Sequence, residues 1–160
     1  MPVTDDDAAG RMRLAWLRLH TLPGGRWLFS RLLGRMIPYT GSIRPEVLAL
    51  EPGFARVRMR DSPRVRNHLR SVHAIALTNL AEVTSGLAMT VALPASVRGI
   101  VIGLSVGFEK KARGTLTAEC RCTVPLVTGP MEFPVTAIVH DAVGDTVAQA
   151  TVVWLLSLRN

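Results

Sequence analysis

The most distinctive chemical group in the sequence is a single carboxylate inside a long apolar segment. Glu82 is the only acidic residue between Asp61 and Glu109, and it lies within the apolar residues 73–93. A carboxylate in such a position either faces solvent on a mostly buried helix or is held there for acid–base or nucleophilic chemistry. Glu82 is therefore the first candidate for a reactive residue.

A second candidate is a group of basic residues, here called the basic cluster. The two lysines of the chain, Lys110 and Lys111, are adjacent and are followed closely by Arg113. The basic cluster is either a solvated turn or an anchor for phosphate groups, to which both side-chain types bind. Three arginines of the polar segment 61–70 would add to the same positive field, namely Arg64, Arg66 and Arg70.

Other reactive centres are not indicated by the residue types and their spacing. The two cysteines, Cys120 and Cys122, are too few for a disulfide framework and have no further Cys or His close by for a zinc site. The sequence has no Gly-rich phosphate loop, metal-ligand spacing or Ser-His-Asp pattern, so we expect neither a metal nor a bound cofactor. Reduced cysteines are usual inside cells, and the cytoplasm is the expected location.

The elements that must position these residues follow from the spacing of apolar residues. Two arginine-rich amphipathic helices are expected first, separated by the Pro-Gly-Gly break at residues 23–25 and ended by Pro38 and Gly41. From residue 43 the apolar period changes to two, which predicts strands. The exception is residues 73–93, where we expect an apolar helix ended by Pro94. Strands are expected at residues 43–50, 54–60, 100–108, 114–124, 133–140 and 146–158.

This order of elements predicts an α+β fold in which one antiparallel sheet wraps around a central helix. Residues 1–42 would form an N-terminal helical extension, and residues 43–160 would form the sheet domain. Both parts together make one domain's worth of chain.

The composition fits a globular protein with a substantial core. The chain has 160 residues, 48% of them hydrophobic, which excludes a wholly disordered protein. No run of about 18 apolar residues indicates a membrane-spanning helix. The formal net charge of +7 would suit nucleic acid, an anionic membrane or a polyanionic small ligand. Because aromatic residues make up only 5% and do not alternate with the arginines, nucleic acid is not the expected partner.

Residues 43–158 resemble the hotdog-fold superfamily, in particular its phenylacetyl-CoA-thioesterase-like branch and a bacterial group of uncharacterised hotdog proteins. The sharpest part of the resemblance is residues 67–82. Family members have an asparagine in the loop, a His-Gly-Gly start to the central helix, and Leu-Ala-Asp or Leu-Ala-Glu inside it. Asn67, His73 and the Leu-Ala-Glu ending at Glu82 fall at the matching offsets.

The resemblance implies hydrolysis of an acyl- or aryl-CoA thioester at the interface of a homodimer or a dimer of dimers. In that reaction Glu82 acts as general base or nucleophile, and Asn67 positions the substrate or water. His73 and the backbone N–H groups of Ala74 and Ile75 bind the thioester carbonyl. The basic cluster anchors the phosphates of CoA, which enters as part of the substrate and not as a cofactor.

One departure from the family pattern bears on activity. Ala74 and Ile75 stand where the family has two glycines, and a β-branched residue narrows the approach of a ligand, although both N–H donors are kept. The alternative is therefore a non-catalytic hotdog module that binds an acyl-CoA or a fatty acid. For His73 the alternative role is bonding to a neighbouring loop, and for Asn67 it is forming a turn.

The spacing of His73 and Glu82 favours a site shared by two chains. The two residues are nine positions apart, which is about 900° around one helix, or half a turn off. Their side chains would then point in opposite directions. A two-fold dimer would instead present the helix start of one chain to Glu82 of the partner subunit.

The arginine-rich N-terminal helices have two interpretations. We expect Trp16, Leu17, Trp27 and Leu28 to pack on the sheet or to cover a substrate tunnel. The alternative is contact of residues 1–40 with an anionic membrane surface, as basic amphipathic helices can make.

Overall fold

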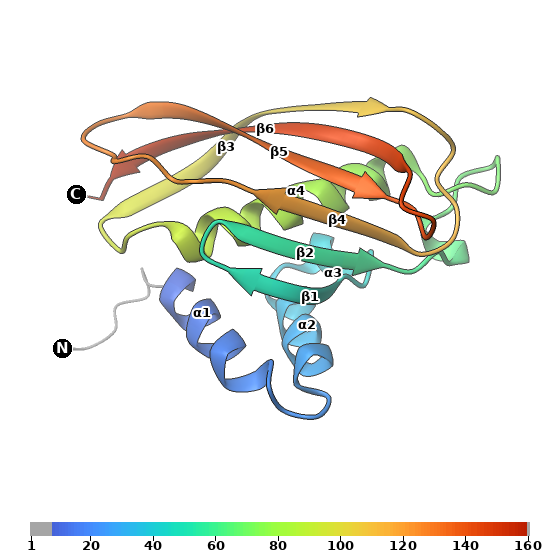
Figure 1. Cartoon of the computed structure of the whole chain (residues 1–160), viewed down its shortest axis with the longest axis horizontal. Coiled ribbons are helices and arrows are strands. Elements are labelled where there is room, and N and C mark those ends of the chain that lie inside the picture. The colour runs from blue at the N-terminus through green and yellow to red at the C-terminus, as the bar shows by residue number, and fades with distance from the viewer. Residues whose placement is uncertain (1–7, 160) are drawn as a thin grey trace.

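The structure, a computed structural model, describes residues 8–159 and contains three N-terminal helices followed by a sheet around a central helix (Figure 1). The N-terminal helices are α1 (Ala8–Leu19), α2 (Gly25–Met36) and the one-turn α3 (Pro38–Gly41). The remaining elements are β1 (Glu46–Glu51), β2 (Phe54–Met59), the 3₁₀ helix η1 (Pro63–Val65), α4 (Ala74–Ala92), β3 (Val97–Phe108), β4 (Leu116–Arg121), β5 (Met131–His140) and β6 (Thr146–Leu158).

The six strands form one antiparallel sheet in the order β1-β2-β4-β5-β6-β3. The sheet curves around α4 (Figure 1). Burial alternates along the strands as their sequence predicts: in β2, Val57 and Met59 are fully buried, whereas Arg56 is exposed. The predicted α+β architecture, with helices preceding the sheet, is confirmed.

Helix α4 forms the core against which the sheet closes. Leu80, Ala81, Ala88 and Met89 have no exposed surface. Among the described helices, α4 is the one long and apolar enough to span a bilayer, but 67% of that segment is buried in the fold. Its apolar character is therefore that of a core helix enclosed by strands.

Several element boundaries differ from the predicted ones by two or three residues, among them the starts of β3 at Val97 and of β5 at Met131. The segment where the second helix was expected to end forms α3 instead, with Pro38 in the first turn, where its missing N–H costs no hydrogen bond. Strand β1 begins at Glu46 because Arg44 has a left-handed backbone (φ 49°) and Pro45 cannot donate to a ladder. Strand β4 ends at Arg121, three residues earlier than expected.

The N-terminal helices share the core of the sheet, but only in part as predicted. Trp16 is buried in the same hydrophobic cluster as the strands. Packing on the sheet is wrong for Leu17, Trp27 and Leu28, whose side chains are exposed. The hydroxyl of Ser30 on α2 accepts the N–H of Val47 at 2.9 Å, so α2 covers part of the edge strand β1.

Candidate functional site

The start of α4 is capped by the side chain of His73. Its ring Nδ1 accepts the backbone N–H of Ile75 at 3.1 Å, and its extended backbone (φ −65°, ψ 140°) is that of an N-cap residue. An Nδ1 atom that accepts a hydrogen bond carries no proton. His73 thus occupies one of the two backbone donors that sequence reasoning assigned to the thioester carbonyl.

The other donor, the backbone N–H of Ala74, has no hydrogen-bond partner among the described residues. It belongs to the first turn of α4, where N–H groups point out of the helix and the dipole favours negative charge. The side chain of Ile75 is 54% exposed beside it. The helix start therefore offers one free donor flanked by an exposed apolar side chain.

Asn67 shapes the loop that leads into α4. Its side-chain oxygen accepts the N–H of Leu69 at 2.9 Å, the N–H of Ser71 at 3.3 Å and the Ser71 hydroxyl at 3.2 Å. These are the contacts of a turn former. The loop ends in the hydrogen bond from the His73 N–H to the Val65 carbonyl at 2.7 Å, which fixes where α4 begins.

Glu82 lies in the middle of the one face of α4 that the sheet leaves open, here called the open stripe. Its residues are spaced four apart and are all partly exposed: Ala74, Thr78, Glu82, Gly86 and Thr90. No described residue forms a hydrogen bond or ion pair with the Glu82 carboxylate. Burial raises the pKa of the Glu82 carboxyl above its usual range, because desolvation disfavours the charged form.

The structure corrects the predicted relative directions of the helix start and of Glu82. Because α4 begins at Ala74, the relevant donor lies eight residues before Glu82, which is about 80° beyond two full turns and about 12 Å along the axis. The two groups thus share the open stripe and do not point in opposite directions, as the spacing of His73 predicted. Distance along the helix, and not angle, keeps them from meeting at one thioester.

The basic cluster lies beside the start of α4. The N–H of Val72 donates to the carbonyl of Ala112 at 2.8 Å, which joins this turn to the loop before His73. Lys110, however, is paired with Asp141 at 2.7 Å and with Asp145 at 2.6 Å. Of the basic cluster, Lys111 and Arg113 are the exposed residues without such an ion pair among the described residues.

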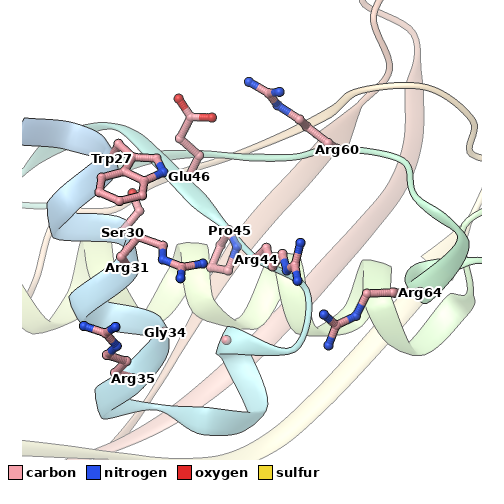
Figure 2. Close-up of a pocket in the computed structure, with 11 residues that line it drawn as sticks. Trp27, Ser30, Arg31, Gly34, Arg35, Arg44, Pro45, Glu46, Arg60 and Arg64 are labelled. Carbon is pink, nitrogen blue, oxygen red and sulfur yellow. The ribbon is translucent and has the colours of Figure 1, made fainter. Parts of the chain in front are cut away.

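Two hollows share the lining residue Arg64, and nothing in the sequence indicated the larger one. The smaller, about 260 Å³, is lined by His73, Ile75 and Asn79. The larger, about 510 Å³, lies between α2, α3 and the strands and is here called the arginine groove (Figure 2). Its basic lining residues are Arg31, Arg35, Arg44, Arg60 and Arg64. The sequence showed arginines in each segment but no signal that the segments converge.

In the described part of the chain, no three His, Cys, Asp or Glu side chains come together in a way that would hold a metal ion. The candidate site brings together a carboxylate, backbone donors and basic side chains.

Comparison with known proteins identifies the family of the chain and its fold. The family model described as "Domain of unknown function (DUF4442)" matches residues 25–156. A crystal structure of a genomics target has a TM-score of 0.80 and 29% identity, covering 92% of this chain and 98% of its own. No curated protein matches the chain.

Two further solved structures share the fold at lower identity. A Pseudomonas aeruginosa protein of unknown function, described as a probable thioesterase, has a TM-score of 0.75 and 24% identity, covering 86% of this chain and 97% of its own. A thioesterase from Haemophilus influenzae has a TM-score of 0.67 and 12% identity, covering 79% and 88%. The sheet wrapped around one helix is the hotdog fold, and the predicted resemblance is confirmed.

Proposed function

The chain belongs to the DUF4442 family of hotdog-fold proteins, and from that premise we propose that it is a thioesterase that hydrolyses an acyl- or aryl-CoA. The observation that carries the proposal is the unpaired, partly buried carboxylate of Glu82 on the open stripe of α4. Proteins of the same fold that are described as thioesterases support it. The reaction needs water and the thioester and no separate cofactor, and the cytoplasm remains the proposed location.

Glu82 is the proposed general base. The raised pKa of its carboxyl brings it closer to neutral pH, where a base both stays ionised and binds a proton well. Glu82 takes a proton from water as the water oxygen bonds to the thioester carbonyl carbon. The C–S bond then breaks, and the proton passes to the leaving CoA sulfur, which gives a free acid and a thiol.

The free N–H of Ala74 is the proposed donor to the carbonyl oxygen. Charge develops on that oxygen during the attack, and a helix N-terminus stabilises negative charge. Because Ala74 and Glu82 of one chain are separated by about 12 Å along α4, they do not reach the same thioester. The proposed site therefore combines Ala74 of one chain with the partner's Glu82.

The edge strand β3 is the proposed dimer interface. It pairs with β6 on one side, and no strand of the described residues pairs with its other edge. Leu104 and Phe108 lie opposite the buried residues Val152 and Ala148, so they are on the concave face of the sheet, yet they are 42% and 49% exposed. A long, exposed apolar edge strand can pair with a second chain. A second copy of this chain bound there would also face the open stripe.

The test is thiol release from a panel of acyl- and aryl-CoAs by wild-type protein and by Glu82→Gln. We expect kcat to fall by about 10²–10⁴-fold in the variant. The matched control is Glu132→Gln, which removes an exposed carboxylate of β5 and leaves kcat unchanged. Hydrolysis by Glu82→Gln at the wild-type rate would refute Glu82 as the base.

A non-catalytic module is the second candidate, and one observation favours it. The Ile75 N–H is held by His73, and the Ile75 side chain stands exposed at the helix start. Such a module would bind an acyl-CoA or a fatty acid and hydrolyse nothing. A rise in Tm with CoA thioesters, without thiol release across the panel, would favour it.

A further inference from the structure

We propose that the arginine groove binds the phosphates of the CoA moiety. The inference rests on the proposed function, since it names how the non-reacting end of that substrate is held. The phosphates would then be bound where the N-terminal helices meet the strands, and not by the basic cluster.

The groove gathers positive charge from four segments of the chain. Arg31 and Arg35 come from α2, and Arg64 comes from η1. Arg44 precedes β1, and Arg60 follows β2. Figure 2 shows Arg31 and Arg64 extending from opposite sides of the groove towards the space beside Arg44. Segments far apart in the chain thus place guanidinium groups around one hollow of about 510 Å³.

These charges are not neutralised by the fold. None of the five arginines forms an ion pair with a carboxylate among the described residues. The carboxylate that lines the groove, Glu46, is already held by Arg58 through two hydrogen bonds of 2.7 and 3.2 Å. Like charges held together repel one another, and a multiply charged anion relieves that repulsion. Arginine binds phosphate oxygens with two parallel donors.

Where α2 meets α3, the lining of the groove includes two glycines. Gly34 and Gly41 both line it, and a Cβ on Gly41 would collide with the Gly34 carbonyl oxygen. The two helices therefore approach each other at a point without side chains.

Trp27 supplies a surface for the adenine ring of CoA. It lines the groove, its side chain is 62% exposed, and the Arg31 guanidinium lies 5.7 Å from its ring centroid. An exposed indole next to a phosphate site suits a nucleotide, because bases stack on aromatic rings. A simple inorganic anion would make no stacking contact with this indole.

The groove and the smaller hollow at the start of α4 share one lining residue. Arg64 lines both the arginine groove and the smaller hollow that contains His73 and Ile75. In CoA the pantetheine arm separates the phosphates from the thioester, so the two ends need sites at some distance along one path. The basic cluster competes less well, because Lys110 is held by two aspartates.

The experiment titrates the protein with CoA, which carries no thioester and is not turned over. Quenching of Trp27 fluorescence reports binding, since Trp16 and Trp154 are 5% and 8% exposed, and calorimetry gives a second measure. We expect 3′,5′-ADP to bind about as well as CoA and pantetheine to bind at least about tenfold more weakly. The double variant Arg31→Ala/Arg64→Ala should weaken CoA binding about 100-fold, about tenfold for each arginine.

The matched control is Arg26→Ala, an exposed arginine of α2 that does not line the groove and should change the Kd less than twofold. Wild-type affinity of the double variant would overturn the inference. So would loss of binding in Lys111→Ala/Arg113→Ala alone, or binding only to phosphatidylglycerol vesicles. If CoA binds through the groove but no thioester is hydrolysed, the proposed function fails and the inference stands.

Discussion

Glu82 is the proposed base, and its burial also lowers the free energy of unfolding at neutral and alkaline pH. Because the folded protein binds the Glu82 proton more tightly than the unfolded chain does, the raised pKa makes the free energy of unfolding fall as pH rises from the usual glutamate range through that pKa. Glu82→Gln removes this fall. At pH 8 we expect a Tm above that of the wild type, by roughly 2–4 °C for each kcal/mol regained.

Thermal unfolding of both proteins at pH 4 and pH 8 measures the effect, with Glu132→Gln as the exposed control. The difference between Glu82→Gln and wild type should shrink at the acidic end, where the carboxyl of the folded protein is protonated. A variant that is less stable at pH 8 would mean that the carboxylate makes a stabilising contact, for example across an interface.

Two variants of His73 distinguish a role in capping α4 from a role in catalysis. His73→Ala removes the acceptor of the Ile75 N–H, which we expect to lower the free energy of unfolding by about 1 kcal/mol, measured from the urea midpoint. His73→Asp supplies a carboxylate acceptor at the same N-cap position and should restore most of that loss. If His73→Asp is as stable as wild type but fails to hydrolyse thioesters, the imidazole has a role beyond the cap.

At the residue scale the sequence predicted identities better than roles. Glu82 stood out because no other acid occurs in its segment, and the structure leaves it without a partner among the described residues. The contacts of His73 and Asn67 are those of a cap and a turn, which their residue types also allowed. Which alternative applies depends on backbone angles and neighbours, and a spacing pattern does not contain these.

At the scale of elements, α2 is tied to the sheet through one buried hydroxyl. The Ser30 hydroxyl accepts the Val47 N–H and donates to the Arg26 carbonyl at 2.7 Å. Ser30→Ala would leave the buried Val47 N–H unpaired, and we expect a loss of about 1–3 kcal/mol in the free energy of unfolding. Ser42→Ala, which removes an exposed hydroxyl bond to Tyr39, is the control and should lose less than about 0.5 kcal/mol. Equal losses in urea unfolding would contradict the importance of this contact.

The helices and strands were largely predictable from the sequence, but the tertiary contacts between them were not. Period-two strands and an apolar helix ended by Pro94 follow from local patterns, so every predicted strand and the central helix are present. The arginine groove depends on a close approach of Gly34 and Gly41 and on four segments that converge only in three dimensions. For the same reason the sequence did not predict that Trp27 is exposed at that groove.

For the whole molecule, the free edge of β3 predicts a dimer in solution. The double variant Leu104→Glu/Phe108→Glu would place charge on the uncovered concave face of the sheet. We expect it to sediment as a monomer in analytical ultracentrifugation. Leu126→Glu, at a residue that is 88% exposed outside the strands, should remain dimeric. A wild-type protein that sediments as a monomer at all concentrations would refute the shared site.

The most direct test of a shared site mixes two inactive variants. Ala74→Pro deletes the free N–H of the helix start, and it suits the fold because His73 already has the extended backbone (ψ 140°) that precedes proline. We expect it to lose about 10²–10³-fold in kcat with unchanged circular dichroism. Glu82→Gln is the second variant.

In a mixed dimer of these two variants, one site carries both lesions and the other carries neither. Random reassortment of equal amounts makes about half of the dimers mixed, so about a quarter of wild-type activity should return. Two different affinity tags confirm that subunits have exchanged. Exchange without recovered activity would mean that each site lies within one chain, and α4 would then have to bring its own start and its own Glu82 to the same thioester across about 12 Å.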